Sequence, residues 1–127
     1  RERPPGCVDP AHVNIRQFAE RSGVSADTLR YYEKIGVLRR LARNPSGHRQ
    51  FDRSDLDWIA FVLRLKATGM PLADIRRYAE LRSQGPATEA ERQALLEAHA
   101  RDLEKRIARD RRHLAAINDK IAFYRQH

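Results

Sequence analysis

The chain has 127 residues, of which 41% are hydrophobic and 33% are charged, and this length suits one ordinary domain with an appended helix and excludes a large two-lobed enzyme. Lys and Arg number 25 against 17 Asp and Glu, so the formal net charge of +8 favours an anionic partner such as nucleic acid. A single cysteine, Cys7, excludes an intramolecular disulfide and a multi-thiolate metal cage within one chain, and we expect a cytoplasmic location. No stretch approaches a membrane span of about 18 apolar residues and no signal peptide is recognised, so we expect no membrane partner.

Two short helices around a tight turn are predicted near the N-terminus. Residues 1–12 contain three prolines and have no apolar period, so they are predicted to be a flexible leader. Asn14 can cap a first helix, which Gly23 closes, and Ser25 can cap a second helix that ends before Gly36. This arrangement predicts a helix-turn-helix, although two short helices alone are a weak signal.

A β-hairpin is predicted after the second helix, because turn residues at 44–47 separate two short extended runs at 37–38 and 48–51. Residues 30–53 carry seven arginines or lysines against two acidic residues, a net charge of +5, whereas the rest of the chain carries +3. This concentration of charge favours a binding face over a uniformly solvated surface.

Three more helices are predicted in the second half of the chain. Ser54 is expected to cap the third helix, which Gly69 closes, and Pro71 suits the first turn of the fourth. Gly85-Pro86 ends the fourth helix, and a capping box that begins at Thr88 opens a long segment without Gly or Pro.

The long C-terminal helix is predicted to carry a coiled-coil seam, because its apolar residues alternate steps of four and three, with Asp110 as the polar interruption. About 40 helical residues span on the order of 60 Å, too long for so small a domain to cover, so a homodimer is favoured. We therefore predict an all-α fold with a small β-hairpin wing: a leader (1–12), a winged helix-turn-helix domain (13–82), a linker (83–87) and a coiled-coil dimerisation helix (88–127). The predicted dimer contacts are Leu96, Ala100, Leu103, Ile107, Leu114, Ile117 and Ile121.

The second helix carries the strongest DNA-binding signal. Its residues 28–34 mix hydroxyl, guanidinium, phenol and ammonium groups, which can reach base edges and phosphates. The hairpin adds cationic side chains that are expected to position the protein on the DNA backbone and not to read sequence. The candidate DNA-binding residues are Arg16, Ser25, Thr28, Arg30, Tyr31, Tyr32, Lys34, Arg43, His48 and Arg49.

These residues resemble the MerR family signature in order and spacing over residues 13 to about 82, and the long terminal helix resembles the family's antiparallel dimerisation coil more loosely. The residues that carry the resemblance are Ala19, Gly23-Val24-Ser25, Thr28-Leu29-Arg30-Tyr31-Tyr32-Glu33, Gly36-Val37-Leu38, Arg43, Gly47, Arg49, Phe51, Asp55, Ile59 and Gly69.

The resemblance implies a dimer whose recognition helices enter successive major grooves of a pseudo-palindromic operator. It implies that an effector triggers bending and untwisting of an overlong promoter spacer for RNA polymerase. Thr28 and Arg30 would then face the groove, Arg49 would anchor the wing, and Tyr31 or Tyr32 would touch phosphate or pack beneath. Arg16 is a weaker phosphate candidate, and Lys34 lies late enough in its helix to be only solvated.

No cofactor is expected, and the effector cannot be named. The cysteines of metal-sensing relatives are missing near the end of the long helix, and His99 and His113, although two heptads apart on one face, are more typical of surface residues. Several aromatic side chains could line an effector pocket, or they could pack in the core. These side chains are Trp58, Phe61, Tyr78, Phe123 and Tyr124.

Three other classes of protein are alternatives to the DNA-binding regulator. A basic coiled-coil adaptor that docks an acidic protein explains the heptads but not the wing. An enzyme lacks support, since no nucleophile-base pair, phosphate loop or multi-ligand metal spacing is recognisable. A small excisionase-like architectural protein would share the winged motif but would not need the long helix.

Overall fold

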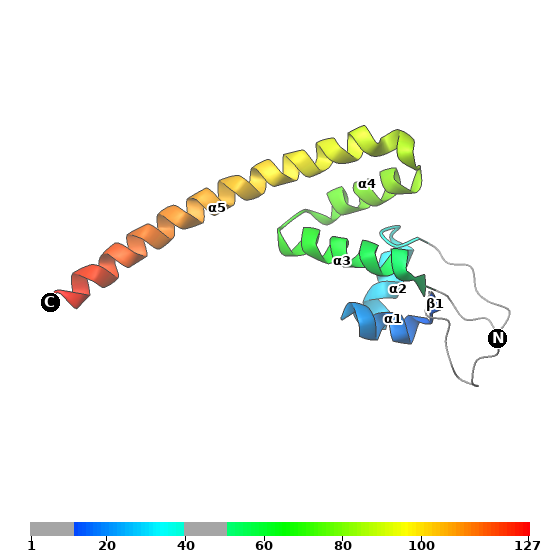
Figure 1. Ribbon diagram of the computed structural model, residues 1–127, viewed down its shortest axis with the longest axis horizontal. Coiled ribbons are helices and arrows are strands. Elements are labelled where there is room, and N and C mark those ends of the chain that lie inside the picture. The colour runs from blue at the N-terminus through cyan, green and yellow to red at the C-terminus, as the bar shows by residue number, and fades with distance from the viewer. Residues whose placement is uncertain (1–11, 40–50) are drawn as a thin grey trace. The chain divides into compact units, whose positions relative to one another are not determined.

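The computed structural model describes residues 12–39 and 51–127 (Figure 1). Cys7, most of the predicted leader and the candidates Arg43, His48 and Arg49 lie outside these ranges. The described chain divides into two compact units, one ending at Glu89 and the other comprising Ala90–His127. Its elements are β1 (His12–Val13), α1 (Ile15–Ser22), α2 (Ala26–Lys34), β2 (Phe51–Asp52), α3 (Arg53–Ala67), α4 (Leu72–Ser83), the 3-10 helix η1 (Pro86–Thr88) and α5 (Glu89–Arg125).

The first two helices begin and end as the sequence predicts. The Asn14 side chain accepts a hydrogen bond from the Gln17 backbone N–H (2.9 Å), and the Gln17 side chain accepts one from the Asn14 N–H (3.1 Å). This reciprocal pair satisfies two donors that the first turn of a helix leaves unpaired. Gly23 ends α1 in the left-handed region (φ 73°), and Ser25 caps α2 through the Thr28 N–H. The predicted helix-turn-helix is confirmed.

The core of the first unit lies between α1, α2, β2, α3 and α4. Phe18 of α1 and Phe51 of β2 are buried, and their rings stack with centroids 4.2 Å apart. α1 packs against both α2 and α3, so this aromatic pair joins the helix-turn-helix to the third helix. The other fully buried large side chains of this core are Leu29, Val37, Leu38, Ile59, Val62 and Ile75.

A two-stranded antiparallel sheet forms where the sequence did not predict one. β1 pairs with β2 in the register His12 with Asp52 and Val13 with Phe51, so the last residue of the predicted leader belongs to the fold. The expected extended strand at 37–38 is wrong. The backbone N–H groups of these two residues donate to the Tyr32 carbonyl (2.8 and 3.0 Å), because they close the C-terminal end of α2 and are not available for a ladder. The remainder of the predicted hairpin, residues 40–50, lies outside the described residues.

The caps of α3 and α4 differ from the sequence prediction by one or two residues. Asp52, not Ser54, caps α3, because its carboxylate accepts the Asp55 N–H (3.0 Å) while the Asp55 carboxylate accepts the Asp52 N–H (3.0 Å). A carboxylate is a strong N-cap, and β2 leads directly into the helix. Pro71 occupies the N-cap of α4 and not its first turn, which begins at Leu72.

The long terminal helix is confirmed. α5 contains 37 residues, about 55 Å of helix, and none of its side chains is buried. Thr88, which precedes α5, is buried and its hydroxyl lies 2.5 Å from the Leu81 carbonyl oxygen and 2.9 Å from that of Gly85. Among the described residues, no helix combines the length and the apolar character that crossing a membrane requires.

Candidate nucleic-acid interface

The second helix of the helix-turn-helix presents one polar face to solvent. Leu29 and Tyr32 are turned into the core and are only 1% and 3% exposed. Arg30 and Lys34 are exposed, and Tyr31 keeps 49% of its surface accessible. The period of the helix therefore separates side chains that hold α2 in place from side chains that can reach a ligand. Tyr31 is thus a surface residue, and the sequence prediction that Tyr32 is at least partly buried is confirmed.

The N-terminal turn of α2 holds two hydroxyl groups together. The Ser25 hydroxyl accepts the Thr28 N–H (3.1 Å) and donates to the Thr28 hydroxyl oxygen (2.8 Å). Ser25 is therefore occupied as a helix cap, and it orients Thr28 at the end of α2 where N–H groups and the helix dipole favour anions. The structure keeps both residues at the N-terminal end of the recognition helix, as the sequence predicts.

Arg30 forms an exposed ion pair with Asp27. The guanidinium Nη1 and the carboxylate Oδ1 are 3.0 Å apart, and the two side chains are 53% and 96% exposed. Pairs of this kind contribute about 0–1 kcal/mol to stability. Separating Arg30 from Asp27 would therefore cost little free energy.

Lys66 of α3 lies against the recognition helix, which the sequence prediction missed. Its ammonium donates to the Tyr32 hydroxyl (3.1 Å) and lies 5.7 Å from the centre of the same ring. From the sequence, Tyr32 can pack in the core or contact phosphate, and its buried ring with Lys66 as a partner favours the packing role. The two residues are 34 positions apart, and no local pattern links them.

An ion pair between the half-exposed Arg39 and the buried Asp55 joins the segment after α2 to the start of α3. The Arg39 guanidinium donates to both oxygens of Asp55 (2.8 and 2.7 Å), and the Asp55 residue is only 3% exposed. Asp52 lies 3.7 Å from the same guanidinium. The Asp55 backbone N–H that donates to Asp52 holds the pKa of Asp52 below its ordinary value, opposed by partial burial and helped by the charge of Arg39. One cation of the basic 30–53 stretch is therefore structural and is not available for DNA.

Two further contacts brace the C-terminal end of α2, and sequence analysis identified neither. The Arg76 Nε of α4 donates to the Ile35 carbonyl (3.1 Å), and the Trp58 indole N–H of α3 donates to the Val37 carbonyl (2.7 Å). Carbonyl groups at the end of a helix lack partners within the helix, so these donors satisfy them from other elements. The C-terminal end of α2 and the turn that follows it are thus held by α3 and α4.

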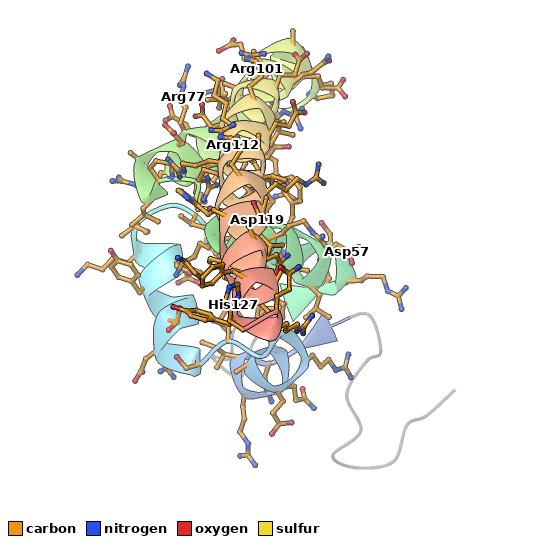
Figure 2. All side chains as sticks on the ribbon, turned by 90° about the vertical axis from the view of Figure 1, so that its left-hand side faces the viewer. Asp57, Arg77, Arg101, Arg112, Asp119 and His127 are labelled. Carbon is orange, nitrogen blue, oxygen red and sulfur yellow. The ribbon has the colours of Figure 1, made fainter. Side chains whose placement is uncertain are left out.

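The other predicted site residues have separate locations. Arg16 is exposed on α1, and the predicted seam residues lie on α5, where the larger aliphatic side chains from Ile107 onward are 41–57% exposed. Figure 2 shows the side chains of α5, among them Arg101, Arg112 and Asp119. Within the described ranges, no group of three or more His, Cys, Asp or Glu side chains is placed to hold a metal ion.

The aromatic candidates for an effector pocket divide into two groups. Trp58 stacks on Tyr78 (5.7 Å between ring centroids), and Phe61 lies 5.9 Å from Tyr78, so these three form one packed cluster. Phe123 and Tyr124 are 50% and 67% exposed on α5. Trp58 and Tyr78 of the first group are buried and pack in the core, and Trp58 also lines a hollow beside α4.

A helix pair with a polar recognition face, braced by a third and a fourth helix, defines a helix-turn-helix DNA-binding protein. The family model described as "MerR HTH family regulatory protein" matches residues 13–81, and the model described as "MerR, DNA binding" matches residues 56–119. The chain belongs to the MerR family of transcription regulators.

Relatives in this family are similar over most of the chain. An HTH-type transcriptional regulator of Haemophilus influenzae is 41% identical over 108 residues, which are 85% of this chain and 80% of the relative. A MerR family regulator from Listeria monocytogenes has a similar structure (TM-score 0.85, 37% identity, 91% of this chain and 87% of that one). HiNmlR, a MerR family regulator lacking the sensor domain and solved bound to promoter DNA, is similar over 91% of both chains (TM-score 0.79, 38% identity). The chain is a DNA-binding transcription regulator.

Proposed function

We propose that the protein acts as a homodimer on a pseudo-palindromic promoter operator, with α2 of each protomer in the major groove. The observation that carries this proposal is the division of α2 into a buried face and a polar exposed face with Arg30 and Tyr31. An α-helix fits the major groove, where base edges present distinct donor and acceptor patterns. The similarity to HiNmlR, whose structure was solved on promoter DNA, supports the same surface as the DNA-binding face.

We assign the candidate residues to two roles on DNA. Thr28 and Arg30, near the N-terminal half of α2, read base edges, and Tyr31, which is 49% exposed, contacts phosphate through its hydroxyl. Ser25 positions Thr28. Sequence-independent contacts to the backbone fall to the remaining cationic side chains, which fix the register of the protein on the duplex. These side chains are Arg16, Lys34, Arg43, His48 and Arg49.

The proposed dimer is made by α5. Its seam repeats apolar residues at heptad spacing from Leu96 to Ile121, about 38 Å of helix. The larger of these side chains, Ile107, Leu114, Ile117 and Ile121, are 41–57% exposed in one chain. A second copy of the same helix can bury an exposed seam of this length. Closed two-fold pairing is the commonest form of such assembly. We infer the antiparallel direction of the two α5 helices from the resemblance to the family, because the seam alone does not define a direction.

From the family membership we infer further that the bound dimer changes the shape of the promoter spacer for RNA polymerase when an effector is present. Proteins that bend or untwist DNA derive part of their specificity from the deformability of the sequence. RNA polymerase is therefore a partner at the promoter, reached through the DNA.

Selection from random duplex DNA followed by sequencing tests the proposed function. We expect an inverted repeat, bound by two copies of the chain, with an affinity that falls steeply with salt at a slope near −0.9 per neutralised phosphate. The Arg30→Ala variant should lose affinity for the recovered site, while Arg64→Ala, which removes a charge from an exposed position of α3, should not. Recovery of no enriched sequence would contradict the proposal and favour the adaptor that docks an acidic protein.

A further inference from the structure

Beyond the DNA-binding face, the first unit contains a partly open hollow of about 510 Å³ between α4, α3 and the turn that follows α2. Its lining residues include four arginines, one glutamate, Glu80, and the aromatic residue Trp58. The four arginines are Arg39, Arg76, Arg77 and Arg82. A hollow of this size lies within the range of about 300–1,000 Å³ that small-molecule sites occupy.

The charges around this hollow do not balance within its lining. Arg39 is compensated by Asp55, its bidentate partner, and the other three arginines share the lining with a single carboxylate, that of Glu80. Arg77 and Glu80 are 3.8 Å apart, a distance typical of a weak pair. Because several cationic side chains share one hollow with a single glutamate, an anion bound there would reduce the repulsion between them.

The arginine side chains also have the right chemistry for a particular class of anion. Guanidinium presents a planar fork of donors that matches the two oxygens of a carboxylate or a phosphate. The Arg82 guanidinium lies 4.5 Å from the centre of the Trp58 ring, and Ile35 and Val37 add apolar surface to the lining. Arg77 projects from α4 in Figure 2. Polar forks beside an aromatic and aliphatic wall suit an organic anion better than a hydrated inorganic ion.

This hollow is connected to the recognition helix by hydrogen bonds. Arg76 lines the hollow and donates through Nε to the Ile35 carbonyl, and the Ile35 N–H donates to the Tyr31 carbonyl at the end of α2. An anion that draws the Arg76 guanidinium toward itself would change the support of the helix that reads DNA. Two sites that share a structural element in this way can be coupled, and the coupling is reciprocal.

We propose that this hollow is a regulatory site for a small organic anion that bears carboxylate or phosphate groups, and that its occupancy changes operator affinity through Arg76 and the end of α2. The regulatory half of this inference rests on the proposed function, since it needs an operator. The binding half does not, because it concerns the DNA-free protein alone. The site therefore supplies a ligand class for the effector.

Trp58 makes the binding half directly measurable, because it lines the hollow and is the single tryptophan of the chain. The full-length protein without DNA is titrated with citrate and with phenyl phosphate, and Trp58 emission is compared with a chloride titration at equal ionic strength. We expect a saturable change with at least one of the two anions. The Arg77→Ala variant should bind it about tenfold or more weakly, because it lacks one charged hydrogen-bond donor. Arg64→Ala, which removes an exposed charge outside the lining, should bind as the parent does.

The controls separate a site from general charge attraction and from misfolding. Arg77→Lys should recover part of the affinity, and far-ultraviolet circular dichroism should show the same thermal unfolding for all variants. No saturable change beyond that of chloride, or equal losses for Arg77→Ala and Arg64→Ala, would overturn the site.

The regulatory half is measured on the selected operator with and without the anion. We expect operator affinity of the parent protein to change with the anion and that of Arg77→Ala not to respond. If the anion binds but operator affinity does not change, the coupling is refuted. If Arg77→Ala weakens binding to all duplexes alike and DNA displaces the anion, the hollow is a contact for backbone phosphate and the small-anion site is refuted. Failure to select an operator would instead contradict the proposed function, and the anion titration would stand.

Discussion

The ion pair between Arg39 and Asp55 should be a main source of stability in the first unit. Asp55→Ala removes both oxygens that receive the Arg39 guanidinium and also the acceptor of the Asp52 N–H at the start of α3. Removing one partner of a buried ion pair costs about 3–5 kcal/mol when the remaining charge stays buried. The Arg39 side chain is 50% exposed, so water can solvate it and reduce that loss.

Loss of the capping acceptor adds about 1 kcal/mol. We therefore expect the free energy of unfolding to fall by about 2–4 kcal/mol in Asp55→Ala. Arg39→Met keeps most of the aliphatic stem and leaves the Asp55 carboxylate buried without its cation. This variant should therefore also lower the free energy of unfolding. Because the two side chains contact each other directly, the double variant should recover about 1–3 kcal/mol relative to the sum of the single changes.

The measurement is urea unfolding followed by far-ultraviolet circular dichroism, at one protein concentration because association would make stability concentration-dependent. The coupling energy of the double-mutant cycle shows whether Arg39 and Asp55 stabilise the fold through their contact with each other. A coupling below about 0.5 kcal/mol would refute the reasoning, since it would show that the two side chains act independently.

Three further predictions concern DNA affinity, dimerisation and acid stability. Arg30→Ala should weaken binding to the selected operator by about 1–3 kcal/mol and should weaken binding to unrelated duplexes much less. Fluorescence anisotropy measures both affinities. Equal losses of affinity on both kinds of DNA would contradict base reading by Arg30. Ile117→Asp should raise the dimer dissociation constant at least about a hundredfold in sedimentation equilibrium, because each Ile buried contributes about 1.5–3 kcal/mol and the change occurs in both copies. Ala116→Asp, at an exposed position beside the seam, is the matched control, and similar dissociation of both variants would exclude this seam. The pKa of Asp52 is lowered in the folded state, so its stabilising effect should be present above the ordinary value of 3.8 and be lost as the pH falls below it. Asp52→Asn should therefore flatten the acid limb of a stability profile, and an unchanged acid limb would argue against this assignment.

The helices were predictable because their signals are local. The capping box of Asn14 and Gln17, the cap at Ser25 and the left-handed Gly23 are each contained within a few residues. The heptad pattern likewise predicted the length of α5 from its own sequence. Element type and most boundaries follow from such short-range chemistry. The cap of α3 was wrong by two residues because Asp52 and Ser54 are both good caps, and tertiary contacts with Arg39 distinguish them.

The parts of the interface that depend on distant residues could not be predicted. β1 pairs with β2 across about 40 residues, and two residues per strand are too few to show an alternating pattern. Lys66 and Arg76 contact Tyr32 and Ile35 from other helices, at separations of 34 and 41 residues. Sequence reasoning named the exposed face of α2 correctly, but not the side chains that hold it.

Contacts of the core hold the two residues that flank residues 40–50. Before this segment, Arg39 forms its ion pair with Asp55. After it, Phe51 is buried against Phe18 and pairs with β1. Arg39 and Phe51 are thus each held by contacts within the described core, independently of each other. Doubling the length of a connection between fixed ends costs only about 0.6 kcal/mol of closure entropy. Arg39 and Phe51 are therefore held in place by the core itself, and a longer or shorter connection between these two residues would change the free energy of folding only slightly.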